Sequence, residues 1–231
     1  MDAKTLETIA EFLGAALAGG LVAIIPILRS RINTYLKSRS EEYIPNSFIK
    51  NKQIVAEVLT ELRICFNADR VRIFQFHNHE HFAPNNPCWR ITNTFEVCHP
   101  GVSHEQGEIQ GVLASAWLDV VQPILTGEST ARGVTILSGV NTKFEALKGV
   151  DKNIILFEVD RMPDSACRQT LFRQGVRFAL MTNLHNKGRA FGFLSVSFVH
   201  DIDNMESVTN KLKDFIDLTD RIQYILISQK E

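Results

Sequence analysis

Two adjacent strand-like segments, residues 176–184 and 190–199, constrain the fold more than any other part of this sequence. The short polar stretch between them contains Gly188, and glycine supplies the positive φ that tight hairpin loops need. Apolar side chains alternate onto both faces of each segment, so we predict a β-hairpin in the centre of a sheet. Gly192, inside the second segment, leaves room for a group packed closely against that strand.

The alternation of side chains also assigns the two faces of this hairpin. In the first strand one face is expected to carry Phe178, Leu180, Thr182 and Leu184. In the second strand one face is expected to carry Ala190, Gly192, Leu194, Val196 and Phe198, opposite Phe191, Phe193, Ser195 and Ser197.

The sequence around the hairpin alternates between helical and strand-like patterns. Apolar residues recur with helical spacing in residues 48–66, 111–125 and 164–174 and in a last helix that begins at Asn204, and residues 141–147 suggest a helical turn. Strand composition is found in residues 70–77, 89–97 and 152–161, with a loop or short strand in 132–140. This order predicts an α+β domain built on one antiparallel sheet.

An apolar stretch near the N-terminus, residues 9–28, contains a single charge, Glu11. About twenty residues of helix are needed to cross a bilayer core, and the basic residues from Arg29 onward place the C-terminal bulk in the cytoplasm. We predict a single-pass transmembrane helix in residues 1–28, a basic connector helix in 29–46 and a folded domain in 47–231. Burial of the apolar helix in a protein assembly is the main alternative; a cleaved signal peptide fits less well because the start is acidic.

Small residues are spaced four apart in this apolar helix, as in the pairs Gly14 with Ala18 and Ala15 with Gly19. Such pairs let membrane helices approach closely and predict self-association, although alanine and glycine are also simply common in such helices. In the last helix of the chain, apolar residues repeat at the four-three spacing typical of a seam with a partner helix, at Val208, Leu212, Phe215 and Ile222.

A family resemblance rests on two segments. The run RQGVRFALMTNLHNKGRAFGFLSVSF resembles the closing half of a GAF domain, in which a short helix ends at a glycine and two strands follow, the second with the pattern xxGxLxV. The opening helix and ADRVRIFQF are similar to the first helix and strand of that family, so the resemblance covers about residues 47–229.

The GAF resemblance implies a central antiparallel sheet of five or six strands with helices on both faces. It also implies that the first and last helices share one face, where they often pair between subunits, and that a ligand pocket lies on the other face. A weaker resemblance, in the FHN sequence that closes the first strand and in EVCHPGVS, is to uncharacterised GAF-like proteins of tailed phages.

The polar, irregular segment 77–104 would lie over the open face of such a sheet, and long irregular segments often carry function. We expect ligand-binding residues there: His77, His79, Trp89, Phe95, Cys98 and His99. The alternating His77, His79 and His81 would point the same way in an extended chain, as metal ligands would. Polar pocket lining and surface or packing roles are the alternatives for these histidines, and the sequence requires no cofactor.

The four cysteines include no CxxC pair, which predicts reduced thiols in a cytosolic compartment. Cys98-His99 is the dipeptide with which phytochrome-type GAF domains attach a bilin, but the surrounding phytochrome motifs are missing. Cys88 and Cys98 are spaced as in GAF-type methionine sulfoxide reductases, whose chemistry needs a nucleophilic thiolate and a resolving cysteine. The third, downstream cysteine of that family is missing near Gln122.

The formal net charge of −1 argues against an electrostatic interaction with nucleic acid, and no phosphate loop or serine nucleophile motif is found. GAF domains are mostly sensory or interaction modules, and a fold alone does not specify a ligand. We expect a non-enzymatic, membrane-anchored GAF-like module that acts as a homo-oligomer through an unidentified partner protein. The alternative is a structural assembly protein, such as a phage virion component whose apolar helix packs in an oligomer or enters the host membrane. A thiol-based methionine sulfoxide reductase is a minor alternative.

Overall fold

The computed structural model describes residues 46–82, 86–138, 152–202 and 205–228. The chain divides into two compact units, residues 1–49 and 50–231, and nearly all described residues belong to the second. The predicted transmembrane and connector helices, with Gly14, Ala18 and Gly19, lie outside the described residues, as does the helical turn predicted at 141–147. Among the described helices, none combines the length and the apolar character needed to cross a membrane.

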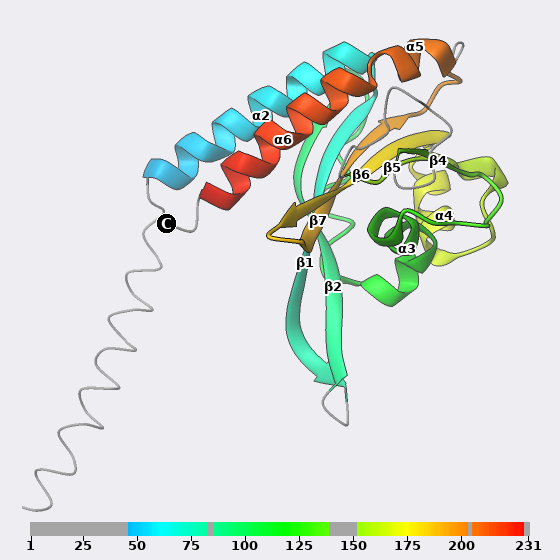
Figure 1. The fold of residues 1–231 in the computed structure, drawn as a ribbon, viewed down its shortest axis with the longest axis horizontal. Coiled ribbons are helices and arrows are strands. Elements are labelled where there is room, and N and C mark those ends of the chain that lie inside the picture. Colours follow the sequence, from blue (N-terminus) through cyan, green and yellow to red (C-terminus); the bar gives the residue numbers. More distant parts are fainter. Residues whose placement is uncertain (1–45, 83–85, 139–151, 203–204, 229–231) are drawn as a thin grey trace, which may run out of the picture. The chain divides into compact units, whose positions relative to one another are not determined.

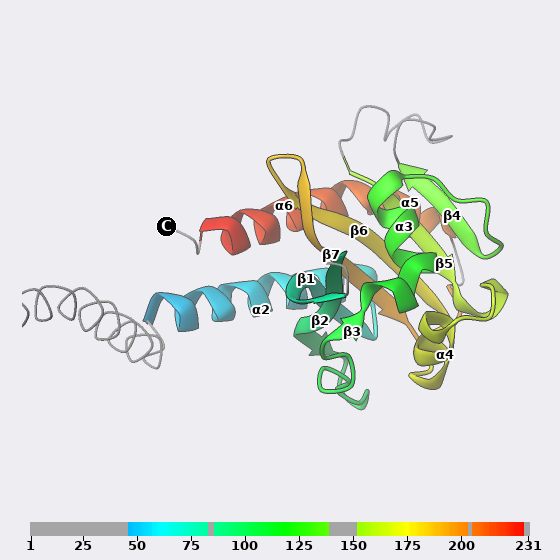
Figure 2. The same ribbon diagram turned by 90° about the horizontal axis from the view of Figure 1, so that it is seen from below.

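A seven-stranded antiparallel sheet forms the centre of the second unit (Figures 1 and 2). From one edge to the other its strands are β3 (Val112–Leu113), β2 (Asn86–Cys98), β1 (Arg70–Phe82), β7 (Arg189–Phe198), β6 (Phe178–Asn186), β5 (Ile154–Glu158) and β4 (Val134–Ser138). All neighbouring strands pair antiparallel. The α+β class is confirmed, and the sheet is wider than expected because a short edge strand has been added beside β2.

The predicted hairpin is confirmed as β6 and β7, near the middle of the sheet. Its two-residue loop is Lys187-Gly188, with φ of 49° and 75°; positive φ at both positions is the requirement of a type I′ turn. Gly192 packs against the backbone of β1, so that a Cβ at this position would overlap the carbonyl oxygen of Phe74. The close approach predicted at Gly192 is therefore made by the neighbouring strand.

A β-bulge changes the face assignment at the start of β7. The β6–β7 pairing runs from Leu184–Gly192 directly to His185–Ala190 and skips Phe191, and one inserted residue reverses the alternation beyond it. Phe191 consequently packs against the core on the face of Leu194 and Val196, whereas Ala190 lies on the opposite face. The predicted faces of Ala190 and Phe191 were therefore wrong, while those of the residues from Phe193 to Phe198 are confirmed.

Three helices, α2 (Asn46–Phe66), α5 (Met205–Asn210) and α6 (Leu212–Ser228), are associated with one face of the sheet (Figures 1 and 2). Their apolar stripes and that face form one core. The helices α2 and α6 run antiparallel, and an ion pair of 3.3 Å joins Glu61 to Arg221. The last helix, predicted as continuous, is interrupted at Lys211.

The apolar seam of the last helix is used inside the chain. The side chains of Val208, Leu212, Phe215 and Ile222 are all buried in this core. Phe215, for example, contacts Phe66 of α2 edge to face, with ring centroids 5.8 Å apart. In this structure the seam therefore pairs α5 and α6 with α2 and the sheet, and these four residues are not exposed to a partner helix.

The opposite face of the sheet is covered by η1 (Ala114–Trp117), α3 (Leu118–Thr126), η3 (Val159–Arg161) and α4 (Ala166–Arg173). Residues 111–125, predicted as one helix, thus form β3, η1 and part of α3. A second core lies beneath them, in which Phe74 stacks on Phe193 with centroids 4.7 Å apart. Helices on both faces are confirmed, and Gly175, with φ of 73°, ends α4 as predicted.

Candidate functional site

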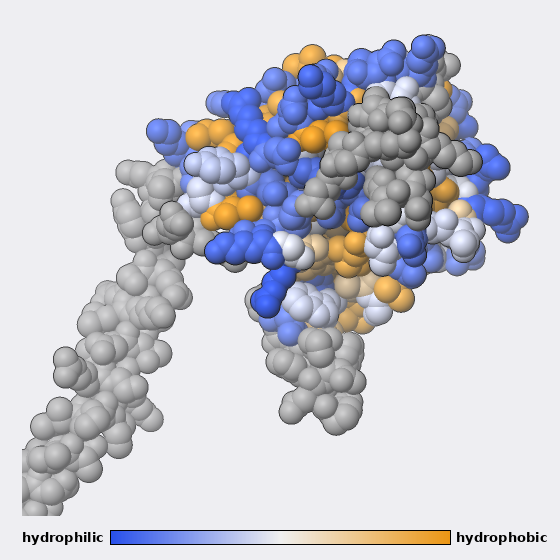
Figure 3. Space-filling view, in the orientation of Figure 1, coloured by the Kyte–Doolittle hydropathy of each residue, from blue (hydrophilic) through white to orange (hydrophobic). Residues whose placement is uncertain are grey.

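A groove of about 640 Å³ lies on the sheet face opposite α2 and α6. Its floor and walls come from four elements: β1, β2 and β7 of the sheet, and the η1–α3 segment above it. The lining residues are Phe76, Trp89, Ala114, Val121, Leu125, Arg189 and Ala190. Figure 3 shows apolar surface where the β1–β2 hairpin meets the α3 region.

The composition of the groove suits an amphipathic molecule. Its volume falls in the range of roughly 300–1,000 Å³ that small-molecule sites occupy, and six of its seven lining residues are apolar. Arg189 supplies a guanidinium at an exposed position, and such a group forms strong, geometrically defined contacts with carboxylates and phosphates. The groove therefore offers an apolar surface with one cationic group.

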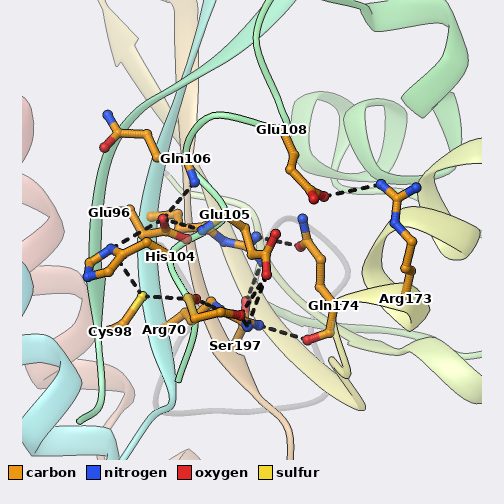
Figure 4. A network of polar contacts seen from close by, with 12 residues as sticks. Arg70, Glu96, Cys98, His104, Glu105, Gln106, Glu108, Arg173, Gln174 and Ser197 are labelled. Carbon is orange, nitrogen blue, oxygen red and sulfur yellow. Dashed lines mark hydrogen bonds and ion pairs between the residues drawn. The ribbon is translucent and has the colours of Figure 1, made fainter. Parts of the chain in front are cut away.

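A polar network occupies the same sheet face nearer to α4 (Figure 4). Arg70 and Arg72 of β1 are both buried. Arg72 donates to Gln174 Oε1 at 2.8 Å and to Ser197 Oγ at 3.1 Å, while Arg70 donates to the carbonyl oxygens of Ser103 and Gln174. These bonds tie the loop after β2 and the end of α4 to the sheet.

A smaller cluster, Glu96–Cys98–His104, lies within this network (Figure 4). Glu96 and Cys98 are two residues apart in β2, so their side chains share a face. His104 approaches from the following loop, with its Nδ1 3.6 Å from both Cys98 Sγ and Glu96 Oε2. Glu96 Oε2 also accepts hydrogen bonds from the backbone N–H groups of Glu105 and Gln106, at 2.8 and 2.7 Å.

Burial sets the acid–base properties of the groups around this cluster. It lowers the pKa of Arg72 to about 10 and raises the pKa of Cys98 to about 11, the latter with help from the Glu96 carboxylate. The Arg70 and Arg72 guanidiniums act against the rise at Cys98. Without a further cation, Cys98 is thus a neutral thiol near pH 7, which is the unreactive form.

Protein-family models and curated proteins gave no match to this chain. Similar solved structures include the phycoerythrobilin-bound GAF domain of a cyanobacterial phytochrome, at 12% identity over 78% of this chain and 89% of that chain, with a TM-score of 0.47. Others are the GAF domain of the cyanobacteriochrome TePixJ (12%, 77% and 89%, TM-score 0.48) and a phycocyanobilin-bound GAF domain of a cyanobacterial phytochrome (13%, 87% and 97%, TM-score 0.47). Identities and TM-scores this low do not transfer a ligand to this chain.

The architecture carries the assignment of the fold. An antiparallel sheet has its first and last helices on one face and a groove on the other, which is the arrangement that the sequence resemblance implied. The fold is GAF-like. In the GAF-like domain the groove also lies where the ligand pocket was expected, on the face away from α2 and α6.

The GAF-like domain separates the residues that were predicted to bind a ligand. Trp89 lines the groove, but His77 lies on the other side of β1, where its Nε2 is 2.8 Å from Thr92 Oγ1. Phe95 packs against the core beneath α2. Cys98 belongs to the polar network, and His99 is exposed with its Nδ1 2.8 Å from the carbonyl oxygen of Pro100.

The alternating histidines of β1 are described only in part. The backbone of His79 and His81 belongs to β1, but their side chains lie outside the description. Among the described side chains, the grouping with metal-ligand spacing is Glu96, Cys98 and His104. Only Cys98 of these three was among the predicted site residues, and the alternation in β2 was the available signal for Glu96.

The two cysteines of the reductase hypothesis are held apart by β2. Cys88 and Cys98 lie near opposite ends of this one continuous strand, and ten residues of strand span about 33 Å. A disulfide needs Cα atoms less than about 7 Å apart. Cys88 is also buried, so within this fold it cannot resolve an intermediate formed on Cys98.

Proposed function

We propose that this chain is a non-enzymatic sensory module whose GAF-like domain binds a small amphipathic molecule in the groove. The observation that carries the proposal is the groove itself: about 640 Å³, apolar in lining, and bearing one guanidinium from Arg189. The molecule that fits has an apolar body that covers Phe76 and Trp89 and an acidic group that pairs with Arg189. The fold determines where the groove lies, and the residues that line it indicate the class of ligand.

The β7 bulge connects the groove to the helical layer, so a displacement in the groove can reach the helices. Ala190 lines the groove, and its neighbour Phe191 packs against the core beneath α2 and α6. A ligand that displaces Ala190 therefore also moves Phe191, because the two residues are adjacent in the bulge. We infer that occupancy of the groove alters the packing of the helical layer, which is the surface that a sensory module offers to a partner.

The outer surface of the helical layer supports self-association or partner binding. Ile64 of α2 and Tyr224 of α6 are 64% and 75% exposed, although both are large and apolar or amphipathic. In our proposal these positions replace the buried seam residues as the contact with a second subunit or a partner protein. The apolar segment 9–28 anchors the module at the cytoplasmic face of a membrane.

Binding of an apolar anion tests the proposed groove. The fluorescent probe 8-anilinonaphthalene-1-sulfonate combines aromatic rings with a sulfonate, and we expect one site per chain in the full-length protein. Ala190→Trp fills the groove and should abolish binding, and Arg189→Ala should weaken binding at least fivefold. The control Lys187→Ala removes an exposed cation from the same hairpin and should leave binding unchanged. Probe binding that is unaffected by Ala190→Trp would refute the groove as the ligand site.

Native mass spectrometry of the full-length protein tests the remaining parts of the proposal. With and without mild detergent, it reports the subunit number, lipid dependence and any co-purified molecule together. A detergent-dependent oligomer that carries a small acidic molecule supports the anchored sensor. A stable ring that forms without detergent contradicts the anchored sensor and favours the structural assembly protein, including a virion component.

A further inference from the structure

We propose that Glu96, Cys98 and His104 form a binding site for a divalent transition metal, with Zn²⁺ as the expected ion. The three residues come from the end of β2 and the loop that follows it. Their ligand atoms all lie within 4.8 Å of one another. This site is separate from the groove and does not depend on the function proposed for it.

Two of the distances within the cluster are close to the edges of a metal coordination sphere. In a tetrahedral zinc site, bonds of about 2.3 Å to sulfur and 2.0–2.1 Å to nitrogen or oxygen place neighbouring ligand atoms about 3.3–3.5 Å apart. His104 Nδ1 lies 3.6 Å from Cys98 Sγ and 3.6 Å from Glu96 Oε2. The separation from Oε2 exceeds the usual N–H···O distance of roughly 2.7–3.2 Å, so the imidazole makes no direct hydrogen bond to Glu96, whereas its contact with Cys98 Sγ is within hydrogen-bonding distance. Both separations are compatible with an ion shared by the three groups.

The Glu96 side chain gives an independent indication that a cation binds here. It is fully buried, and within the described part of the chain Oε1 has no hydrogen-bond partner. A buried carboxylate oxygen without a partner costs free energy unless a cation or a donor reaches it. Oε2, the oxygen 3.6 Å from His104 Nδ1, accepts from the backbone N–H groups of Glu105 and Gln106, and such support orients the carboxylate toward the cluster.

The electrostatic surroundings allow a thiolate and a divalent ion together. Glu96 and Glu105 carry two negative charges near the two positive charges of Arg70 and Arg72, so these side chains are balanced before metal binding. Coordination deprotonates Cys98, and the thiolate then offsets half of the charge of the ion. The guanidiniums of Arg70 and Arg72 favour the thiolate, since both lower the pKa of Cys98.

The donor set selects the metal. One thiolate, one imidazole and one carboxylate suit Zn²⁺ and related transition metals, whereas Mg²⁺ and Ca²⁺ take oxygen ligands. Three protein ligands with a fourth position left to water are the pattern of an accessible zinc site. His104 is 70% exposed, so an ion can enter from solvent at this side of the cluster.

Metal titration of the full-length protein tests the site. After removal of metals with a chelator, we expect calorimetry to show one Zn²⁺ bound per chain. Co²⁺ in its place should give the near-ultraviolet absorption of a thiolate–cobalt bond. Cys98→Ser should abolish this absorption, and His104→Ala should weaken Zn²⁺ binding more than tenfold. Mutation of a residue that only supports a metal ligand lowers metal affinity by roughly 10- to 100-fold, and loss of a direct ligand should lower it by at least as much.

Matched variants separate the site from unspecific binding by thiols and imidazoles. Cys65→Ser removes a thiol from α2, and His99→Ala removes an exposed imidazole from the same loop as His104; both should bind Zn²⁺ as the unmodified protein does. Because His104 is largely exposed, its replacement should leave the melting temperature of the metal-free protein unchanged. An unmodified protein that binds no Zn²⁺, or equal losses in His104→Ala and His99→Ala, would overturn the proposal.

Discussion

Replacement of Gly192 by alanine should be among the most damaging single-methyl changes in this domain. Gly192 lies in β7 between Leu184 of β6 and Gln75 of β1. An added Cβ would overlap the carbonyl oxygen of Phe74 and would lie 3.1 Å from Gln75 Cα. Both groups are backbone atoms of the neighbouring strand, so no side-chain rotation can relieve the overlap, and β1 must move away from β7.

The loss of folding stability in Gly192→Ala can be estimated from the clash between β7 and β1. Overpacking a core costs typically 1–3 kcal/mol and occasionally more, and a clash with backbone belongs at the upper end, about 3 kcal/mol. In a unit of this size, each kcal/mol lowers the melting temperature by roughly 2–4 °C. Gly192→Ala should therefore lower the melting temperature by about 6–12 °C.

Thermal unfolding followed by circular dichroism measures this difference, with Gly107→Ala as the matched control. A Cβ at Gly107 meets no atom within 4 Å, and its φ is not positive, so the control should change stability by less than about 0.5 kcal/mol. Equal melting temperatures for the two variants would show that β1 and β7 are not packed as described.

Two variants and one chemical modification probe the buried network, the helical seam and the thiol. Arg72→Ala leaves Gln174 Oε1 without its donor, whereas Ser197 Oγ keeps its contact with Ser195 Oγ, and the change should cost about 1–3 kcal/mol in urea unfolding; a loss below about 0.5 kcal/mol would contradict this. Phe215→Ala should cost about 3–5 kcal/mol independently of protein concentration, whereas a concentration-dependent loss would place Phe215 between subunits. Alkylation of Cys98 by iodoacetamide in metal-free protein should accelerate up to about pH 11; a plateau near pH 9 would refute the buried thiol.

The central hairpin could be predicted because its information is local. Alternating apolar residues, a glycine-containing turn and Gly192 all lie within 24 consecutive residues, and each acts through neighbouring backbone. The bulge at Phe191 could not be predicted, since a strand of apolar residues on both faces reads equally well in either register. The partner strand and the two cores decide which face each side chain takes.

Helix boundaries on the second sheet face were harder to predict. Residues 112–117 have apolar spacing compatible with a helix, yet Val112 and Leu113 pair with β2. This pairing is a tertiary contact that overrides local preference. The interruption of the last helix at Lys211 likewise could not be predicted, because no proline or glycine lies there.

The candidate metal site shows the same limit. Cys98 was selected from its sequence context, and alternation in β2 would have added Glu96 to the same face. His104, however, reaches them because the loop after β2 folds back, held by the bonds of Glu105 and Gln106 to Glu96 and of Arg70 to Ser103. A loop that is held by such tertiary contacts carries no periodic signal in the sequence.

The antiparallel pairing of α2 and α6 also has a mechanical consequence. The start of α2 within the domain and the end of α6 lie at the same end of the helix pair (Figure 1). A force that pulls these two ends apart peels one helix from the other instead of shearing them along their length. Contacts then break one after another from that end, with the Glu61–Arg221 ion pair lost before the Phe66–Phe215 contact deeper in the pair. A force applied at these two ends would therefore separate α2 from α6 first.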